Sequence, residues 1–221
     1  MTNRYFYQAN IATFLAEDTN SIFGQMSLAD EMDTASTQKF AWEHEITIMK
    51  NLLAPYSNEP AHIIFEYTIP RLGKRIDVVV LLRERVFVVE FKAGEEEFKH
   101  QDVDQVLDYA LDLQNFHQGS ADRWIIPILV ATEETAFSTL CQPSHYDDGI
   151  YEPLLTNAAH LKDVFELVLS QPLEPIDVRC KPDTVHWFLD DINDVRSSLF
   201  LEDAASEFDV LGLELDWTCV V

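Results

Sequence analysis

Apolar residues recur with two different periods along the chain, and these periods separate predicted helices from predicted strands. A spacing of three or four residues is typical of a helix with one buried face, whereas runs of β-branched and aromatic residues are typical of strands. The predicted helices cover residues 4–16, 37–53, 102–117 and 161–169. The predicted strands cover residues 62–70, 75–82, 86–93 and 124–132. Pro127 in the last strand predicts an edge strand or a bulge.

The order of these segments is helix, three strands, helix, strand. It predicts an α/β domain, spanning 37–170, in which helices flank one mixed central sheet. Residues 1–36 are expected to form a helix followed by a polar loop over 17–36. Residues 171–221 are expected to form a proline-spaced linker and an acidic C-terminal segment.

Composition narrows the class of protein. The chain has 221 residues, 47% of them apolar, as expected for a globular protein with a real core. It has neither an apolar run long enough to cross a bilayer nor the apolar segment of an N-terminal secretory signal. The cysteines are odd in number and widely spaced: Cys141, Cys180 and Cys219. These features predict reduced thiols in a cytoplasmic protein without membrane contact.

The formal net charge of −24 argues against a nucleic-acid partner, because phosphate binding normally shows as a basic surface. The charge is unevenly distributed, however. Seven of the fifteen basic residues lie between Arg71 and Lys99, and the stretch from Asp183 to the end has ten acids and one base. The basic middle keeps nucleic acid open as a partner.

Glu45 interrupts the apolar stripe of the helix predicted over 37–53. On a helical wheel, Ala41, Ile48, Met49 and Leu52 all fall within about 60° of it. A carboxylate in such a stripe is costly to bury unless it is paired or binds a cation. Glu43 falls on the opposite, polar side of the same helix.

Asp77 and Glu90 interrupt two strongly apolar strands that only Arg83–Arg85 separate. A tight antiparallel hairpin is therefore expected. With a two-residue loop at Arg83 and Glu84, Asp77 lies directly opposite Glu90, at about 5 Å between Cβ atoms. Lys92 shares the face of Glu90. The register is inferred, since the loop lacks the Asn-Gly that would fix its type.

Two carboxylates this close repel each other unless a cation lies between them. Hydrolysis of a phosphodiester needs such a cation, and Mg²⁺ prefers carboxylate oxygens. A lysine beside the metal can stabilise the transition state or orient the attacking water. The structural alternative is a half-exposed hairpin with an Asp–Lys salt bridge on its wet face, and the spacing alone does not separate the two.

The pattern Arg75-Ile-Asp77, then Glu90-Phe-Lys92, resembles the PD-(D/E)XK nuclease motif, and Glu45 stands where that fold places an acid on its first helix. The predicted order of elements is also similar to the restriction-endonuclease-like αβββαβ core of that superfamily. The resemblance implies that Asp77, Glu90, Glu45 and the Phe91 carbonyl ligate Mg²⁺ or Mn²⁺, with Lys92 as a catalytic residue.

Gln105-Val-Leu-Asp-Tyr109 resembles the QxxxY element of RecB-like nucleases. The two residues lie one turn apart on one face of the predicted helix, away from the apolar stripe of Val103, Val106 and Ala110. By this resemblance they face nucleic acid. The basic residues expected to contact phosphates are Arg71, Lys74, Arg75 and Lys99.

The segment Phe65–Val79 with Val88–Lys92 is also similar to the N-terminal module of Schlafen-like bacterial DNA/RNA helicases. Residues 194–221 resemble a late segment of the same family. No GxxxxGK[ST] phosphate-binding loop occurs in the chain, so an ATP-driven motor is expected only as a separate helicase or ATPase subunit. Trp217–Val221 predicts a final strand that needs a partner edge, which a homo-oligomer could supply, and the sequence leaves the oligomeric state open.

Two hypotheses follow. The first is a metal-dependent nuclease that acts on DNA in phage defence or repair. The second is a catalytically inactive nuclease-fold module that binds a helicase partner or nucleic acid. The complete set of Glu45, Asp77, Glu90 and Lys92 favours the first, whereas the strong acidity favours the second.

Overall fold

The computed structural model describes residues 4–30, 36–69, 74–120, 122–134, 143–173 and 176. Within these residues six strands form one sheet in the order β1-β2-β3-β4-β5-β6. They are β1 (Tyr7–Asn10), β2 (Ala61–Thr68), β3 (Arg75–Leu82), β4 (Arg85–Lys92), β5 (Trp124–Ala131) and β6 (Leu154–Thr156). Strands β1 to β4 pair antiparallel, and β4, β5 and β6 pair parallel, so the predicted mixed sheet is confirmed.

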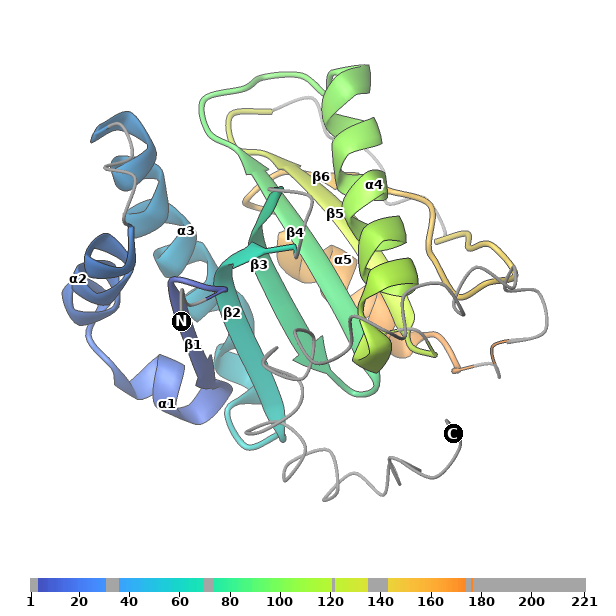
Figure 1. Ribbon diagram of the computed structural model, residues 1–221, viewed down its shortest axis with the longest axis horizontal. Coiled ribbons are helices and arrows are strands. Elements are labelled where there is room, and N and C mark those ends of the chain that lie inside the picture. The colour runs from blue at the N-terminus through green and yellow to red at the C-terminus, as the bar shows by residue number, and fades with distance from the viewer. Residues whose placement is uncertain are drawn as a thin grey trace.

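Helices cover both faces of this sheet (Figure 1). They are α1 (Ile11–Ala16), α2 (Thr19–Ala29), α3 (Ser36–Leu53), α4 (His100–Phe116) and α5 (Leu161–Ser170), with 3-10 turns at Ala54–Tyr56 and Gln118–Ser120. Helix α4 lies on one face, and α5 lies on the other. The predicted α/β class is therefore confirmed, and the order α3-β2-β3-β4-α4-β5 agrees with the predicted helix, three strands, helix and strand.

The two faces carry separate apolar clusters. The α3-side cluster includes Trp42, Phe65, Val78, Phe87 and Phe165, and the rings of Phe87 and Phe165 stack at 4.2 Å between centroids. The α4-side cluster includes Ile76, Val79, Val88, Val106 and Leu113. Successive strand residues supply opposite clusters because side chains alternate across a sheet. This is why the strands appear in the sequence as continuous apolar runs.

The N-terminal segment differs from the prediction in two places. Tyr7–Asn10 is a strand that pairs with β2, where a helix over 4–16 was expected. Thr19–Ala29 is a helix, where a loop over 17–36 was expected. Its signals are local: the Asp18 side chain accepts a hydrogen bond from the Asn20 amide at 2.9 Å as an N-cap, and Ile22 and Met26 lie buried one turn apart.

The prediction of an edge strand at Pro127 is wrong, because β5 lies between β4 and β6, whereas the alternative of an irregularity agrees with the interrupted pairing on the β6 side. Pro127 is tolerated by its position. Strand β6 pairs only with Ile128–Val130, and the remaining bridge on that side joins Ile125 to Ile150. Residue 127 falls in the gap between these contacts, where the missing N–H costs little.

The linker and acidic C-terminal segment predicted for 171–221 lie outside the described residues, except for 171–173 and 176. The same holds for all three cysteines, for the helicase-like stretch 194–221 and for the strand predicted at the C-terminus. Among the described helices, none combines the length and apolar character that crossing a membrane requires.

Candidate active site

The β3–β4 hairpin turns at Arg83 and Glu84, as predicted. Both residues have positive φ values, 49° and 62°, which is the backbone signature of a two-residue type I′ turn. The ladder runs from Leu82 opposite Arg85 to Val78 opposite Val89. Extended by one residue, this register brings Asp77 opposite Glu90, so the inferred register is confirmed up to the point where the ladder ends.

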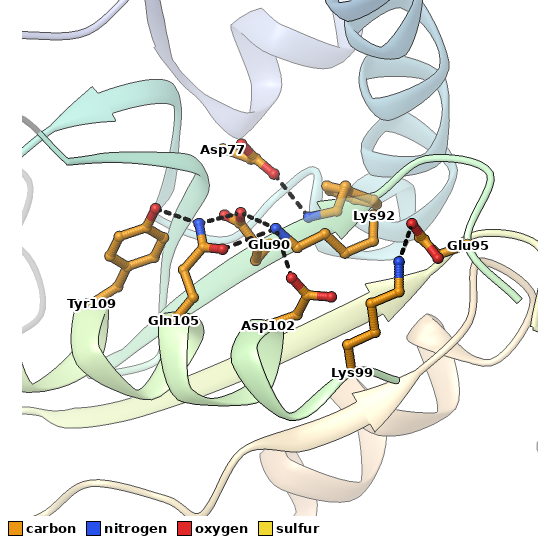
Figure 2. A network of polar contacts seen from close by, with 9 residues as sticks. Asp77, Glu90, Lys92, Glu95, Lys99, Asp102, Gln105 and Tyr109 are labelled. Carbon is orange, nitrogen blue, oxygen red and sulfur yellow. Dashed lines mark hydrogen bonds and ion pairs between the residues drawn. The ribbon is translucent and has the colours of Figure 1, made fainter. Parts of the chain in front are cut away.

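Asp77 replaces the next rung of the ladder with a side-chain contact. The Phe91 amide donates a hydrogen bond to Asp77 Oδ2 at 2.8 Å (Figure 2). A carboxylate therefore satisfies an N–H group that would otherwise be unpaired at the end of the hairpin. This contact fixes Asp77 beside the segment Glu90–Lys92.

Lys92 lies at the centre of a polar network that joins β4 to α4. Its Nζ donates to Glu90 Oε1 at 3.0 Å and to Gln105 Oε1 at 3.0 Å, and it forms an ion pair with Asp102 Oδ1 at 3.5 Å. Figure 2 shows the three acceptors around the ammonium group. Burial lowers the pKa of Lys92, but Glu90, Asp102 and Asp77 outweigh this effect and raise it above its usual value. Lys92 is therefore a fixed cation.

Gln105 links this network to Tyr109. Its Nε2 donates to Glu90 Oε1 at 2.8 Å and to the Tyr109 hydroxyl at 2.6 Å. Gln105 and Tyr109 therefore meet one turn apart on α4, as the spacing predicts. The ring of Tyr109, however, packs within the α4-side cluster beside Val106 and Ala110 rather than away from the apolar stripe.

Four carboxylates, Glu45, Glu66, Asp77 and Glu90, form one electrostatically coupled acidic cluster. Burial, then the charge of Asp77, raises the pKa of Glu90 to about 9. Burial, then Asp77, Glu66 and Glu90, raises the pKa of Glu45 well above its usual value. The pKa of Asp77 is also raised by burial, although the Phe91 amide and Lys92 oppose the rise. Of these groups Glu90, with a pKa of about 9, favours the protonated form at neutral pH when no cation is bound.

Three oxygen atoms of the acidic cluster are buried and accept no hydrogen bond from a protein N–H or O–H donor: Glu45 Oε2, Glu66 Oε2 and Glu90 Oε2. Of these, Glu66 Oε2 forms an ion pair with Arg75, and the Glu90 carboxyl can share a proton with Asp77. The side chain of Glu90 is only 5% exposed. Buried acceptors without partners are rare and indicate a missing ligand or a strained site. Among the described residues, no group of three or more His, Cys, Asp or Glu side chains is arranged to hold a metal ion. The side-chain oxygens that could bind a cation beside the Phe91 backbone therefore come from two carboxylates, Asp77 and Glu90.

Sequence reasoning missed two buried acids at this site, Asp102 and Glu66. Asp102 lies in the first turn of α4, where an acidic residue is common for helix-dipole reasons and attracts no notice. Glu66 interrupts the apolar run of β2, the same signal that identified Asp77 in β3. Its Oε1 accepts a hydrogen bond from Trp42 Nε1 at 2.7 Å. Burial and the charge of Asp77 raise its pKa to about 7.

The basic residues predicted to contact phosphates are paired with acids. Lys74 forms ion pairs with Asp108 and Asp112 of α4, at 3.4 and 3.2 Å. Arg75 pairs with Glu66 and Lys99 with Glu95, in the latter case at 2.6 Å. Arg71 lies outside the described residues. Nucleic acid would therefore have to compete with carboxylates of the chain for these three cations.

No protein-family model matches the chain, and no curated protein or solved structure shows significant similarity to it. Function must therefore be argued from the site. Its chemistry is that of a half-buried carboxyl group, Asp77, beside a buried one, Glu90, with a neighbouring lysine ammonium held by three acceptors and a glutamine that contacts both Glu90 and Lys92.

Proposed function

We propose that this chain is a metal-dependent nuclease that hydrolyses phosphodiester bonds of nucleic acid, with DNA as the expected substrate. The observation that carries the proposal is the meeting of Asp77 and Glu90 at the end of the β3–β4 ladder, where the two carboxyl groups hydrogen-bond to each other and the Lys92 ammonium contacts Glu90. Such an enzyme would act on nucleic acid in the cytoplasm.

The residues present fit a divalent cation. Asp77, Glu90 and the Phe91 carbonyl would hold it, and all three supply the oxygen donors that Mg²⁺ and Mn²⁺ prefer. Glu45, expected from the sequence as a further ligand, would add negative charge near the ion, because it does not complete a three-acid metal group with them. A bound cation would also neutralise the acidic cluster, whose mutual repulsion is otherwise relieved only by protons. Mg²⁺ needs few protein ligands because it keeps several waters. When bound, the ion would supply charge neutralisation at the phosphate and a water molecule of lowered pKa.

The protein groups around the cation have separate roles in this proposal. Lys92 donates a hydrogen bond from its ammonium group to a non-bridging oxygen of the scissile phosphate, which stabilises the charge that develops there. Its contact with Asp102, at 3.5 Å, is the longest of its three and the one most easily exchanged for substrate. Gln105 holds both Glu90 and Lys92, so it keeps the carboxylate and the ammonium at a fixed separation.

The test is cleavage of labelled single- and double-stranded DNA and RNA by the purified chain with Mg²⁺, with Mn²⁺ and with chelator. We expect cleavage only with metal, and a loss of at least about a hundredfold in Asp77→Asn and in Lys92→Met. Lys162→Met is the matched control, because Lys162 is an exposed lysine of α5 whose ion pair within the described part of the chain is with Glu166. Its activity should equal that of the wild type.

The proposal fails if the wild type cleaves none of the four substrates with either metal. It also fails if Lys92→Met and Lys162→Met retain the same activity, because cleavage would then come from another site or from a contaminant. A result with RNA alone would change the substrate and keep the chemistry.

A second candidate function is favoured by the paired cations and by the net charge of −24. In this alternative the chain is an inactive nuclease-fold module that binds a helicase or ATPase subunit, and that partner supplies the basic surface. Metal binding without cleavage by the pure chain, together with cleavage after a basic partner is added, would favour a partner-dependent nuclease. Absence of both metal binding and cleavage would favour the inactive module.

A further inference from the structure

Glu66 adopts a backbone conformation that strand residues rarely adopt. Among the described residues, three other than glycine have positive φ: Arg83 and Glu84, which form the hairpin turn, and Glu66, with φ of 55°, inside β2. A left-handed conformation is unfavourable for an L-residue that lacks a turn to impose it. Surrounding contacts must therefore hold Glu66 in place, and such outliers gather at functional sites.

At Glu66 the regular alternation of side chains between the two faces of the sheet is interrupted, and this interruption is called the change of phase below. In a regular strand, residues two apart face the same side of the sheet. In β2, however, Phe65 belongs to the α3-side cluster and Tyr67 to the α4-side cluster, and in β3 the same change occurs between Val78 and Ile76. The pairs Phe65–Val78 and Tyr67–Ile76 flank the change. Glu66 is thus the residue of β2 that lies opposite Asp77.

The carboxylate of Glu66 connects the two elements that carry the other acids. Its side chain is 2% exposed. One oxygen accepts from Trp42 Nε1 at 2.7 Å, three residues before Glu45 on α3. The other pairs with Arg75 Nε, two residues before Asp77 on β3. These contacts stabilise both the left-handed backbone and the change of phase beside Asp77.

The end of the β3–β4 ladder follows from this change of phase. Regular pairing stops after Val78 and Val89, and the Asp77 carboxylate then reaches the Phe91 amide. If β3 continued with regular alternation, Ile76 would face the α3-side cluster and the pairing with β4 could continue. The deviation at Glu66 and the position of Asp77 are therefore one structural feature.

We infer that Glu66 is a positioning residue for Asp77: the ion pair with Arg75 and the bond from Trp42 hold the ends of β2 and β3 so that Asp77 meets Phe91 and Glu90. The inference deepens the proposed function, on which its link to a metal site rests. It differs from a role for Glu66 as a metal ligand, because breaking the ion pair from the Arg75 end must have the same effect.

The experiment measures hydrogen exchange of the Phe91 amide by NMR in the metal-free wild type, Glu66→Gln, Arg75→Met and the double variant. Each single change should speed exchange at Phe91 roughly tenfold, the expected effect of losing one hydrogen bond. The double variant should match the singles, because both remove one ion pair. Exchange at Val80 and Phe87, which form a hydrogen-bonded pair of the regular ladder, should stay as in the wild type. Glu59→Gln, which removes the distant pair with Arg83, is the matched control.

A second measurement follows Mn²⁺ binding by calorimetry in the same variants. Loss of a group that orients a ligand costs about ten- to a hundredfold in metal affinity, so both single variants should bind Mn²⁺ more weakly by about that factor. Loss of binding in Glu66→Gln with wild-type binding in Arg75→Met would overturn the inference in favour of direct ligation. Unchanged exchange at Phe91, or faster exchange at all ladder amides alike, would also overturn it. A wild type that binds no Mn²⁺ while Phe91 behaves as expected would refute the proposed function alone.

Discussion

Replacing Glu90 with glutamine tests whether this residue holds a proton in the metal-free acidic cluster. Burial and the charge of Asp77 raise the pKa of Glu90 from 4.5 to about 9. The folded chain therefore binds this proton more tightly than the unfolded chain does. The contribution to stability is fully present below the unfolded pKa and is lost as the pH rises toward the folded pKa. Glutamine resembles the protonated acid in shape and carries no charge to lose.

The size of the effect follows from linkage. When the pH rises from about 7 to about 9, a group with these two pKa values lowers the free energy of unfolding by about 2 kcal/mol. For a domain of this size that corresponds to a decrease of about 4–8 °C in the melting temperature. Glu90→Gln should lack this decrease, so its advantage over the wild type should grow with pH in this window. Glu43→Gln, on the exposed side of α3, should follow the wild type.

Melting curves recorded with a divalent cation allow a second comparison between the wild type and Glu90→Gln. A divalent cation must displace the Glu90 proton, so its binding should strengthen as the pH rises. At about a hundred times its Kd, the cation should stabilise the wild type by about 3 kcal/mol, and it should stabilise Glu90→Gln far less. If the wild type and Glu90→Gln lose stability in parallel from about pH 7 to about pH 9, and gain equally from Mg²⁺, the account of the acidic cluster is wrong.

Three further predictions concern other residues. Burial lowers the pKa of His117 to about 3, so stability should fall as the pH decreases below about 6.5, by up to about 1.4 kcal/mol per pH unit; urea unfolding of His117→Gln should lack this slope. Asp102→Asn removes the charge that substrate must displace from Lys92, so it should lower KM about fivefold at unchanged kcat, whereas Asp104→Asn, on the exposed face of α4, should have no effect. Because Lys74, Arg75 and Lys99 are paired with acids, the slope of log K against log salt for DNA should be shallower than about −3 in anisotropy titrations with Ca²⁺, and a steeper slope would contradict this.

The sequence predicts those parts of the fold whose signals are local. Strands β2 to β5 are runs of β-branched and aromatic residues, and the short separation at Arg83 and Glu84 fixes the register of the hairpin. Strand β1 is different, because Tyr7–Asn10 has only four residues and exists through its pairing with β2. The same holds for β6, which has three residues. Short edge strands depend on tertiary contacts that no local pattern records.

Some residues of the candidate site can likewise be predicted from local sequence signals, and others cannot. An acid inside an apolar strand identifies Asp77 and Glu90, because burial of an unpaired charge is costly. Asp102 could not be found this way, since an acid in the first turn of a helix has an ordinary explanation. Glu66 carries the same signal as Asp77, but its left-handed backbone is invisible in the sequence. Only the structure shows that it faces Asp77.

The most direct test of the central claim, that Asp77 and Glu90 form a divalent-metal site, is anomalous diffraction from crystals grown with Mn²⁺. We expect one strong peak between these two carboxylates, close to the Phe91 carbonyl, and no peak there in crystals of Glu90→Gln. A wild-type map with Mn²⁺ only at exposed acids, or with none, would contradict the claim.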